Sequence, residues 1–111
     1  RAAEQILREE LARFEVGQRA GVVEPMVRAL FEYVARVHAS ELERSLAGRL
    51  RCLSHDEREG IEMLLEASKK KLLHEPVTRL RQLASDDPEA ASELVRALGE
   101  LFGIAFEGEQ P

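Results

Sequence analysis

Residues that build disulfide frameworks or stacking platforms are scarce in this sequence. The 111 residues contain no tryptophan, one tyrosine, four phenylalanines and a single cysteine, Cys52. One cysteine can form neither an intramolecular disulfide nor a cysteine-based metal cluster. Such usage is typical of a reducing compartment, so we expect a cytoplasmic protein.

Long apolar runs are also missing. No uninterrupted stretch approaches the roughly 18 residues that a bilayer-spanning helix needs, and no leader peptide is visible, so the sequence predicts no membrane association. With 44% hydrophobic and 33% charged residues, the composition is that of a globular chain. Its length predicts one domain.

An excess of positive charge is absent as well. The net charge is −5, and residues 54–111 carry seven Lys or Arg against thirteen Asp or Glu. Independent nucleic-acid-binding domains usually show the opposite balance. A docking platform for a regulatory protein on the acidic residues 54–66 remains an alternative.

Strand-like alternation occurs nowhere, whereas apolar residues recur at helical spacing throughout. We expect an all-α protein, a helical bundle of about four to five helices completed by a two-fold partner chain. Residues 1–16 form the first predicted helix, residues 17–24 a loop, and residues 25–53 a long second helix with Pro25 in its first turn. The first helix begins without a capping residue, so we interpret residues 1–16 as the end of a longer connecting helix and the chain as a fragment.

Local signals define the later helices. Ser54 and Glu57 fit a capping box, Asp87 and Pro88 fit an N-cap followed by proline at the first helical position, and Gly103 fits a C-terminal stop after which Ile104 or Phe106 folds back. The last helix is predicted to bury Ala91, Leu94, Val95, Leu98, Leu101 and Phe102.

The first half of the second helix is apolar around most of its circumference. Only Arg28, Glu32 and Arg36 interrupt it, on one narrow line. A helix of this kind must be covered on several sides, and a symmetric partner offering the same helix would provide the cover. The predicted dimer interface comprises Met26, Val27, Leu30, Phe31, Val34 and Val37.

Pro76 lies inside the third predicted helix. It has no N–H, and its ring clashes with the carbonyl group four residues earlier. The apolar stripe Ile61, Leu65, Ser68, Leu72 is one residue out of phase with the stripe that begins at Leu73 and Val77. We therefore predict a kink or break at residues 73–76.

Catalytic, cofactor-binding and metal-binding residues are not predicted in this chain. His38, His55 and His74 lie far apart without companions at metal-ligand spacing. Lys69, Lys70 and Lys71 could contact phosphates, but consecutive helical residues point in different directions. A solvated helix end is the favoured interpretation, and a tRNA-contacting helical module remains an alternative.

The segment around Pro76 resembles the C-terminal dimerisation region of glutamyl-tRNA reductases. That family has approximately Asn-Lys-Leu-Leu-His-x-Pro followed by a leucine and a basic residue. The matching positions here are Lys71, Leu72, Leu73, His74, Pro76, Leu80 and Arg81, while Lys70 replaces the usual asparagine. Residues 41–46, 53–64 and 101–105 are also similar in sequence to the corresponding parts of the family, so the resemblance extends over the whole chain.

The resemblance implies a C-terminal helical dimerisation domain spanning residues 1–111. The parent enzyme would use NADPH to reduce tRNA-bound glutamate to glutamate 1-semialdehyde, in tetrapyrrole (porphyrin and haem) biosynthesis. In that family the nucleophilic cysteine and the NADPH site lie in other domains, which also make most contacts with the tRNA. The chain itself is therefore expected to be inactive, to bind no cofactor and to form a homodimer.

Overall fold

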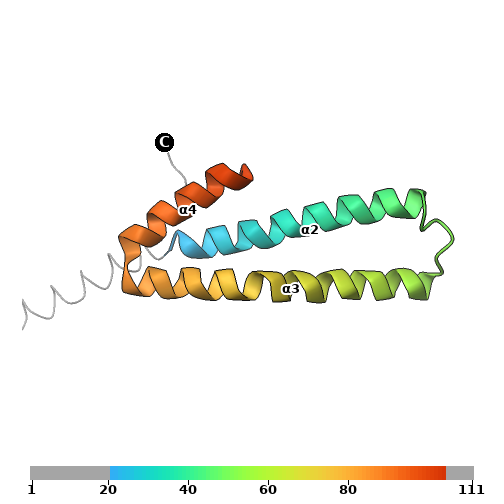
Figure 1. The fold of residues 1–111 in the computed structure, drawn as a ribbon, viewed down its shortest axis with the longest axis horizontal. Helices are drawn as coiled ribbons and strands as arrows, with labels where there is room; N and C mark the ends of the chain where they lie inside the picture. The colour runs from blue at the N-terminus through green and yellow to red at the C-terminus, as the bar shows by residue number, and fades with distance from the viewer. Residues whose placement is uncertain (1–20, 105–111) are drawn as a thin grey trace, which may run out of the picture. The chain divides into compact units, whose positions relative to one another are not determined.

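A computed structural model describes residues 21–104, which form three helices and no strand: α2 (Val23–Ala47), α3 (His55–Asp86) and α4 (Pro88–Phe102) (Figure 1). The predicted all-α class is confirmed. The helix predicted for residues 1–16, most of the loop after it, and Phe106 lie outside the described residues. The described part has fewer helices than the four to five predicted for the chain, partly because residues 55–86 form one helix.

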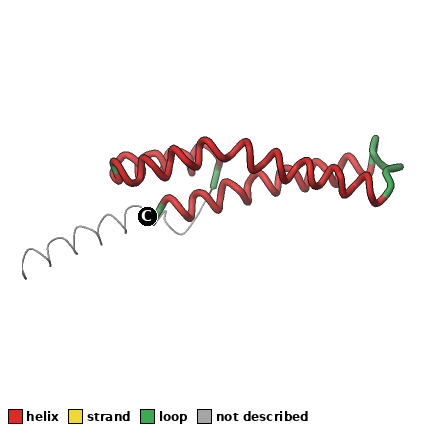
Figure 2. Tube along the Cα trace, turned by 90° about the horizontal axis from the view of Figure 1, so that it is seen from below, coloured by secondary structure: helices red, strands yellow, loops and turns green. Residues whose placement is uncertain are grey.

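The chain divides into two compact units. The hairpin unit comprises residues 30–76, in which most of α2 and the first two-thirds of α3 run antiparallel, joined by residues 48–54 (Figure 2). Of the described residues, the terminal unit comprises 21–29 and 77–104, which are the start of α2, the end of α3 and all of α4.

Helix α2 ends six residues earlier than predicted, at Ala47 rather than near Leu53. Gly48 follows, and its N–H donates to the carbonyl of Ser45 at 3.0 Å, while the N–H of Leu50 donates to the same carbonyl at 2.8 Å. These short-range bonds turn the chain out of the helix. The helical spacing of Leu46, Leu50 and Leu53 therefore continues past the true helix end.

The two predicted N-terminal caps are confirmed. The N–H of Ser54 donates to Oε1 of Glu57 at 2.8 Å, and the N–H of Glu57 donates to Oγ of Ser54 at 3.1 Å. At the start of α4, the N–H of Ala90 donates to Oδ1 of Asp87 at 3.2 Å. These bonds satisfy N–H groups that lack a partner within the helix.

The end of α4 also follows the sequence prediction. Gly103 takes the left-handed conformation, with φ 65°, which glycine adopts without steric cost. The N–H of Ile104 then donates to the carbonyl of Gly99 at 2.8 Å, as in a Schellman motif. The Ile104 side chain is buried, so the chain does fold back on the last turn.

Helix α3 continues without interruption through Pro76, so a break there was wrong, while the alternative of a kink stays a prediction. The assumed stripe was wrong at Leu72, which is 64% exposed, whereas Ile61, Leu65 and Ser68 are half-buried. The covered side of α3 instead follows residues at four-residue steps, namely Ile61, Leu65, Lys69, Leu73 and Val77. Lys69 occupies the position that joins the two apolar stripes, and no break is needed to connect them.

Small residues decide which face of α4 is buried in the terminal unit. The buried residues of α4 are Ala91, Val95 and Gly99, at spacing i, i+4, i+8. The prediction that Leu94, Leu101 and Phe102 are buried was wrong, since they are 42%, 80% and 41% exposed. Helix α4 carries two apolar faces, and the one with alanine and glycine allows the closer approach of helix axes.

Candidate functional site

The predicted interface segment of α2 is largely covered by the chain itself. Met26, Val27 and Leu30 are 0%, 5% and 6% exposed. These three residues therefore need no partner chain to cover them. Phe31 and Val34 are half-buried, and Val37 is 45% exposed. Contact of the six residues with a partner stays a prediction, which the exposed fractions favour only for the last three.

Lys69 is the most enclosed charged side chain described in the hairpin unit. Only 12% of the side chain is exposed, and its Nζ lies 2.9 Å from Oε2 of Glu66. The same nitrogen lies over the Phe31 ring, 6.0 Å from the ring centroid, at the outer limit for a cation–π contact. The hydrogen bond from Lys69 lowers the pKa of Glu66 below its usual value.

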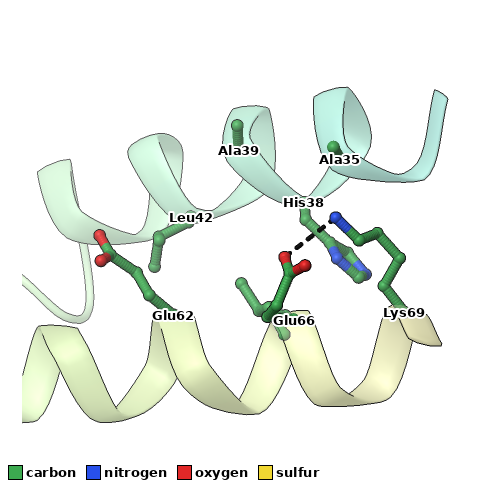
Figure 3. A pocket seen from close by; sticks show the side chains of 8 residues that line it. Ala35, His38, Ala39, Leu42, Glu62, Glu66 and Lys69 are labelled. Atoms are coloured by element: carbon green, nitrogen blue, oxygen red, sulfur yellow. Dashed lines mark ion pairs between the residues drawn. The ribbon is translucent and has the colours of Figure 1, made fainter. Parts of the chain in front are cut away.

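A shallow groove of about 240 Å³ between α2 and α3 lies beside this ion pair (Figure 3). Helix α2 contributes His38 and Leu42 to its lining, and α3 contributes Glu62 and Glu66. Figure 3 shows the Lys69 ammonium turned toward the Glu66 carboxylate, both side chains rising from α3 on the side that lines the groove. The cation is thus already paired with an anion of its own chain.

The three consecutive lysines do not form one surface. The side chain of Lys69 is largely buried, whereas Lys70 and Lys71 are exposed. Four-residue spacing would also permit a Glu66–Lys70 pair, but the structure forms Glu66–Lys69 at three-residue spacing. An electrostatic phosphate site would therefore have two exposed lysines rather than three.

The terminal unit contains an ion pair that helical spacing could not predict. Nε and Nη2 of Arg81, on α3, donate to the two carboxylate oxygens of Glu24, on α2, each at 2.9 Å. The hydrogen bond with Arg81 lowers the pKa of Glu24, and the same bond raises the pKa of Arg81. The two residues are 57 positions apart in sequence, so only the tertiary fold brings them together.

Side chains that could hold a metal ion do not gather within residues 21–104, where no group of three or more His, Cys, Asp or Glu residues has suitable geometry. His38 lines the groove, and His55 lies 3.9 Å from Glu59 at the start of α3. Cys52 is exposed in the loop between α2 and α3.

The predicted structural motif lies on α3, where it has one buried member. Leu73 is 8% exposed, whereas Lys71, Leu72, His74 and Pro76 are exposed.

Among the described residues, no helix is both long enough and apolar enough to cross a bilayer.

Comparison with known families decides what this helical arrangement is. A family model described as "Glutamyl-tRNAGlu reductase, dimerisation domain" matches residues 2–104. The chain belongs to this family. The resemblance seen in the residues around Pro76 is thereby confirmed.

Known relatives of this dimerisation domain are similar over nearly the whole chain. Glutamyl-tRNA reductase of Sorangium cellulosum (strain So ce56) is 41% identical over 102 residues, covering 92% of this chain and 19% of that protein. The enzyme of Roseiflexus castenholzii is 42% identical over 104 residues (92% and 23%), and that of Synechocystis sp. is 34% identical over 107 residues (96% and 25%). The chain spans about a fifth to a quarter of these relatives' length. No solved structure matches it.

The dimerisation domain keeps several large apolar side chains in solvent. On α3, Met63, Leu64 and Leu72 are 68%, 64% and 64% exposed. On α4, Leu94, Leu101 and Phe102 are the exposed members. The sequence analysis placed the candidate dimer interface on α2. It did not identify Met63 and Leu64 as exposed apolar residues, because both are neighbours of the regular apolar stripe of α3.

Proposed function

We propose that this chain joins two subunits of a glutamyl-tRNA reductase into a homodimer. The observation that carries the proposal is the exposure of Met63 and Leu64 on α3 in a member of the dimerisation-domain family. Complete burial of such a side chain contributes about 1.5–3 kcal/mol. With about two-thirds of each still exposed, a partner could recover roughly 1–2 kcal/mol from each residue in every subunit.

The parent protein, on this proposal, is a cytoplasmic enzyme of tetrapyrrole biosynthesis. It uses NADPH to reduce tRNA-bound glutamate to glutamate 1-semialdehyde, and its catalytic and NADPH-binding domains lie elsewhere in the protein. Support comes from relatives named glutamyl-tRNA reductase, which match 92–96% of this chain. This chain would then set the spacing between two catalytic units, without contributing a catalytic group.

Light scattering of the chain at micromolar concentration tests the dimer. The expected species has twice the chain mass of 12.5 kDa, in a reducing buffer because Cys52 is exposed. Leu64→Glu should weaken association, since a charge would enter the contact. Arg28→Glu, at an exposed polar position of α2, is the control.

A well-folded species at monomer mass would contradict the proposal. Calorimetric titration with NADPH tests the division of labour between domains. We expect no binding by this chain, and a clear micromolar isotherm would contradict that part.

A further inference from the structure

One side of α3 is exposed along four turns. Its middle consists of Gly60, Met63, Leu64 and Ala67, all exposed, and each of them lies three positions from one of the others and four positions from another. Residues at this spacing share one side of a helix. The stripe continues to Asp56 and Glu57 at one end and to Lys70 and Lys71 at the other, all exposed. It is apolar at its centre and oppositely charged at its two ends.

Gly60 supplies a second observation on the same stripe. Glycine inside a helix is about 1 kcal/mol less favourable than alanine. A Cβ added at Gly60 would meet no atom within 4 Å, so nothing in the described chain requires the missing side chain. Absence of Cβ permits a second helix to approach closely, because the separation of packed helices depends on the side chains between them.

We propose that this stripe packs antiparallel against the same stripe of a second copy of the chain. The two-fold axis passes between Met63 and Leu64. The inference rests on the proposed function and deepens it by naming the contact. A two-fold contact needs a surface that is complementary to itself, and the stripe on α3 meets this requirement. Met63 faces Leu64 of the partner subunit, and Gly60 faces Ala67 of the partner subunit.

Charge selects the antiparallel direction. About the same axis, Asp56 faces Lys71 of the partner subunit and Glu57 faces Lys70 of the partner subunit, so each end joins opposite charges. Parallel packing in register would instead set acidic residues beside acidic ones and lysines beside lysines. The ends lie about 22 Å apart along the helix, at 1.5 Å per residue, which exceeds the screening length of roughly 8–10 Å. Each end therefore contributes independently to the direction.

Exchange of the end charges tests this geometry. Asp56→Lys places lysine beside lysine at both ends of its own dimer, and Lys71→Glu places carboxylate beside carboxylate. Each variant alone should self-associate about tenfold more weakly, since two exposed pairs change from attraction to repulsion. In an equimolar mixture, a dimer of one chain of each kind has opposite charges at both ends. Sedimentation equilibrium of the mixture should recover the affinity of the unmutated chain.

Arg58→Glu is the matched control, because it changes the charge by the same amount as Lys71→Glu on the same helix. Arg58 is exposed and lies about 200° around the helix from Gly60, so its variant should dimerise like the unmutated chain. Circular dichroism checks that every variant keeps its helical content.

The outcomes separate this inference from the proposed function. If the unmutated chain dimerises but either single variant matches it in affinity, or the mixture fails to recover, the stripe is not the contact, while the dimer itself stands. If the unmutated chain is a monomer, both proposals fail. Weakened single variants with recovery in the mixture support the antiparallel contact.

Discussion

Replacement of Pro76 by alanine should stabilise the chain. Pro76 lies in the interior of α3 and is exposed, so its removal opens no cavity. Proline has no N–H, and the carbonyl of Leu72 therefore lacks its usual partner four residues later. In Pro76→Ala the new N–H can donate to that carbonyl, and the clash of the ring with the preceding turn disappears.

The expected gain follows from helix propensities. Proline in a helix interior is about 3 kcal/mol less favourable than alanine. Since α3 already accommodates the ring without a break, part of that cost has been relaxed. We therefore expect the free energy of unfolding to rise by about 1–3 kcal/mol. Urea unfolding followed by circular dichroism measures it, at one fixed protein concentration because association also stabilises the folded chain.

Pro88→Ala is the control for this measurement. Pro88 is the first residue of α4, where the backbone N–H has no partner within the helix in any case. Its replacement should change the free energy of unfolding by less than about 1 kcal/mol. An unchanged or lower stability for Pro76→Ala would refute the reasoning, and it would mean that the proline shapes α3 for the packing of Leu73 and Val77.

Three further predictions concern the terminal unit and its caps. Met26→Ala should lower the free energy of unfolding by about 2–5 kcal/mol, because Met26 is fully buried. Urea unfolding measures this change, and a loss under about 1 kcal/mol would contradict the described core. Because the folded-state pKa of Glu24 is lowered, the stability from its pair with Arg81 is present above the unfolded-state pKa, near 4.5, and is lost as the pH falls through the folded-state value. Glu24→Gln should therefore flatten the pH dependence of unfolding below about pH 5, and an unaltered profile would argue against the pair. Asp87→Ala should cost about 0.5–2 kcal/mol, measured by thermal unfolding, with Asp87→Asn expected to keep most of the stability.

The features predicted correctly from the sequence are those determined by residues close together in the chain. The Ser54–Glu57 box, the Asp87 cap and the Gly103 stop each depend on groups within a few residues of one another. Their hydrogen bonds join groups close together in the chain, so the local sequence was sufficient to predict them.

The features predicted wrongly depend on which of two available faces is buried. Helix α4 has apolar residues on two sides, and periodicity alone does not reveal that packing uses Ala91 and Gly99 rather than Leu101. On α3, a lysine was assigned to solvent because of its charge, yet the long apolar stem of Lys69 lies in the covered stripe and its ammonium reaches Glu66. Tertiary packing decided both cases.

Gly60 has a consequence for how this domain can change during evolution. Alanine there would strengthen the helix of a lone chain by about 1 kcal/mol, and no neighbouring atom of the described chain opposes it. In the antiparallel pair that we propose, the same methyl group would push the two helices apart. Selection for a more stable single subunit and selection for a more stable dimer would then favour different residues at this one position.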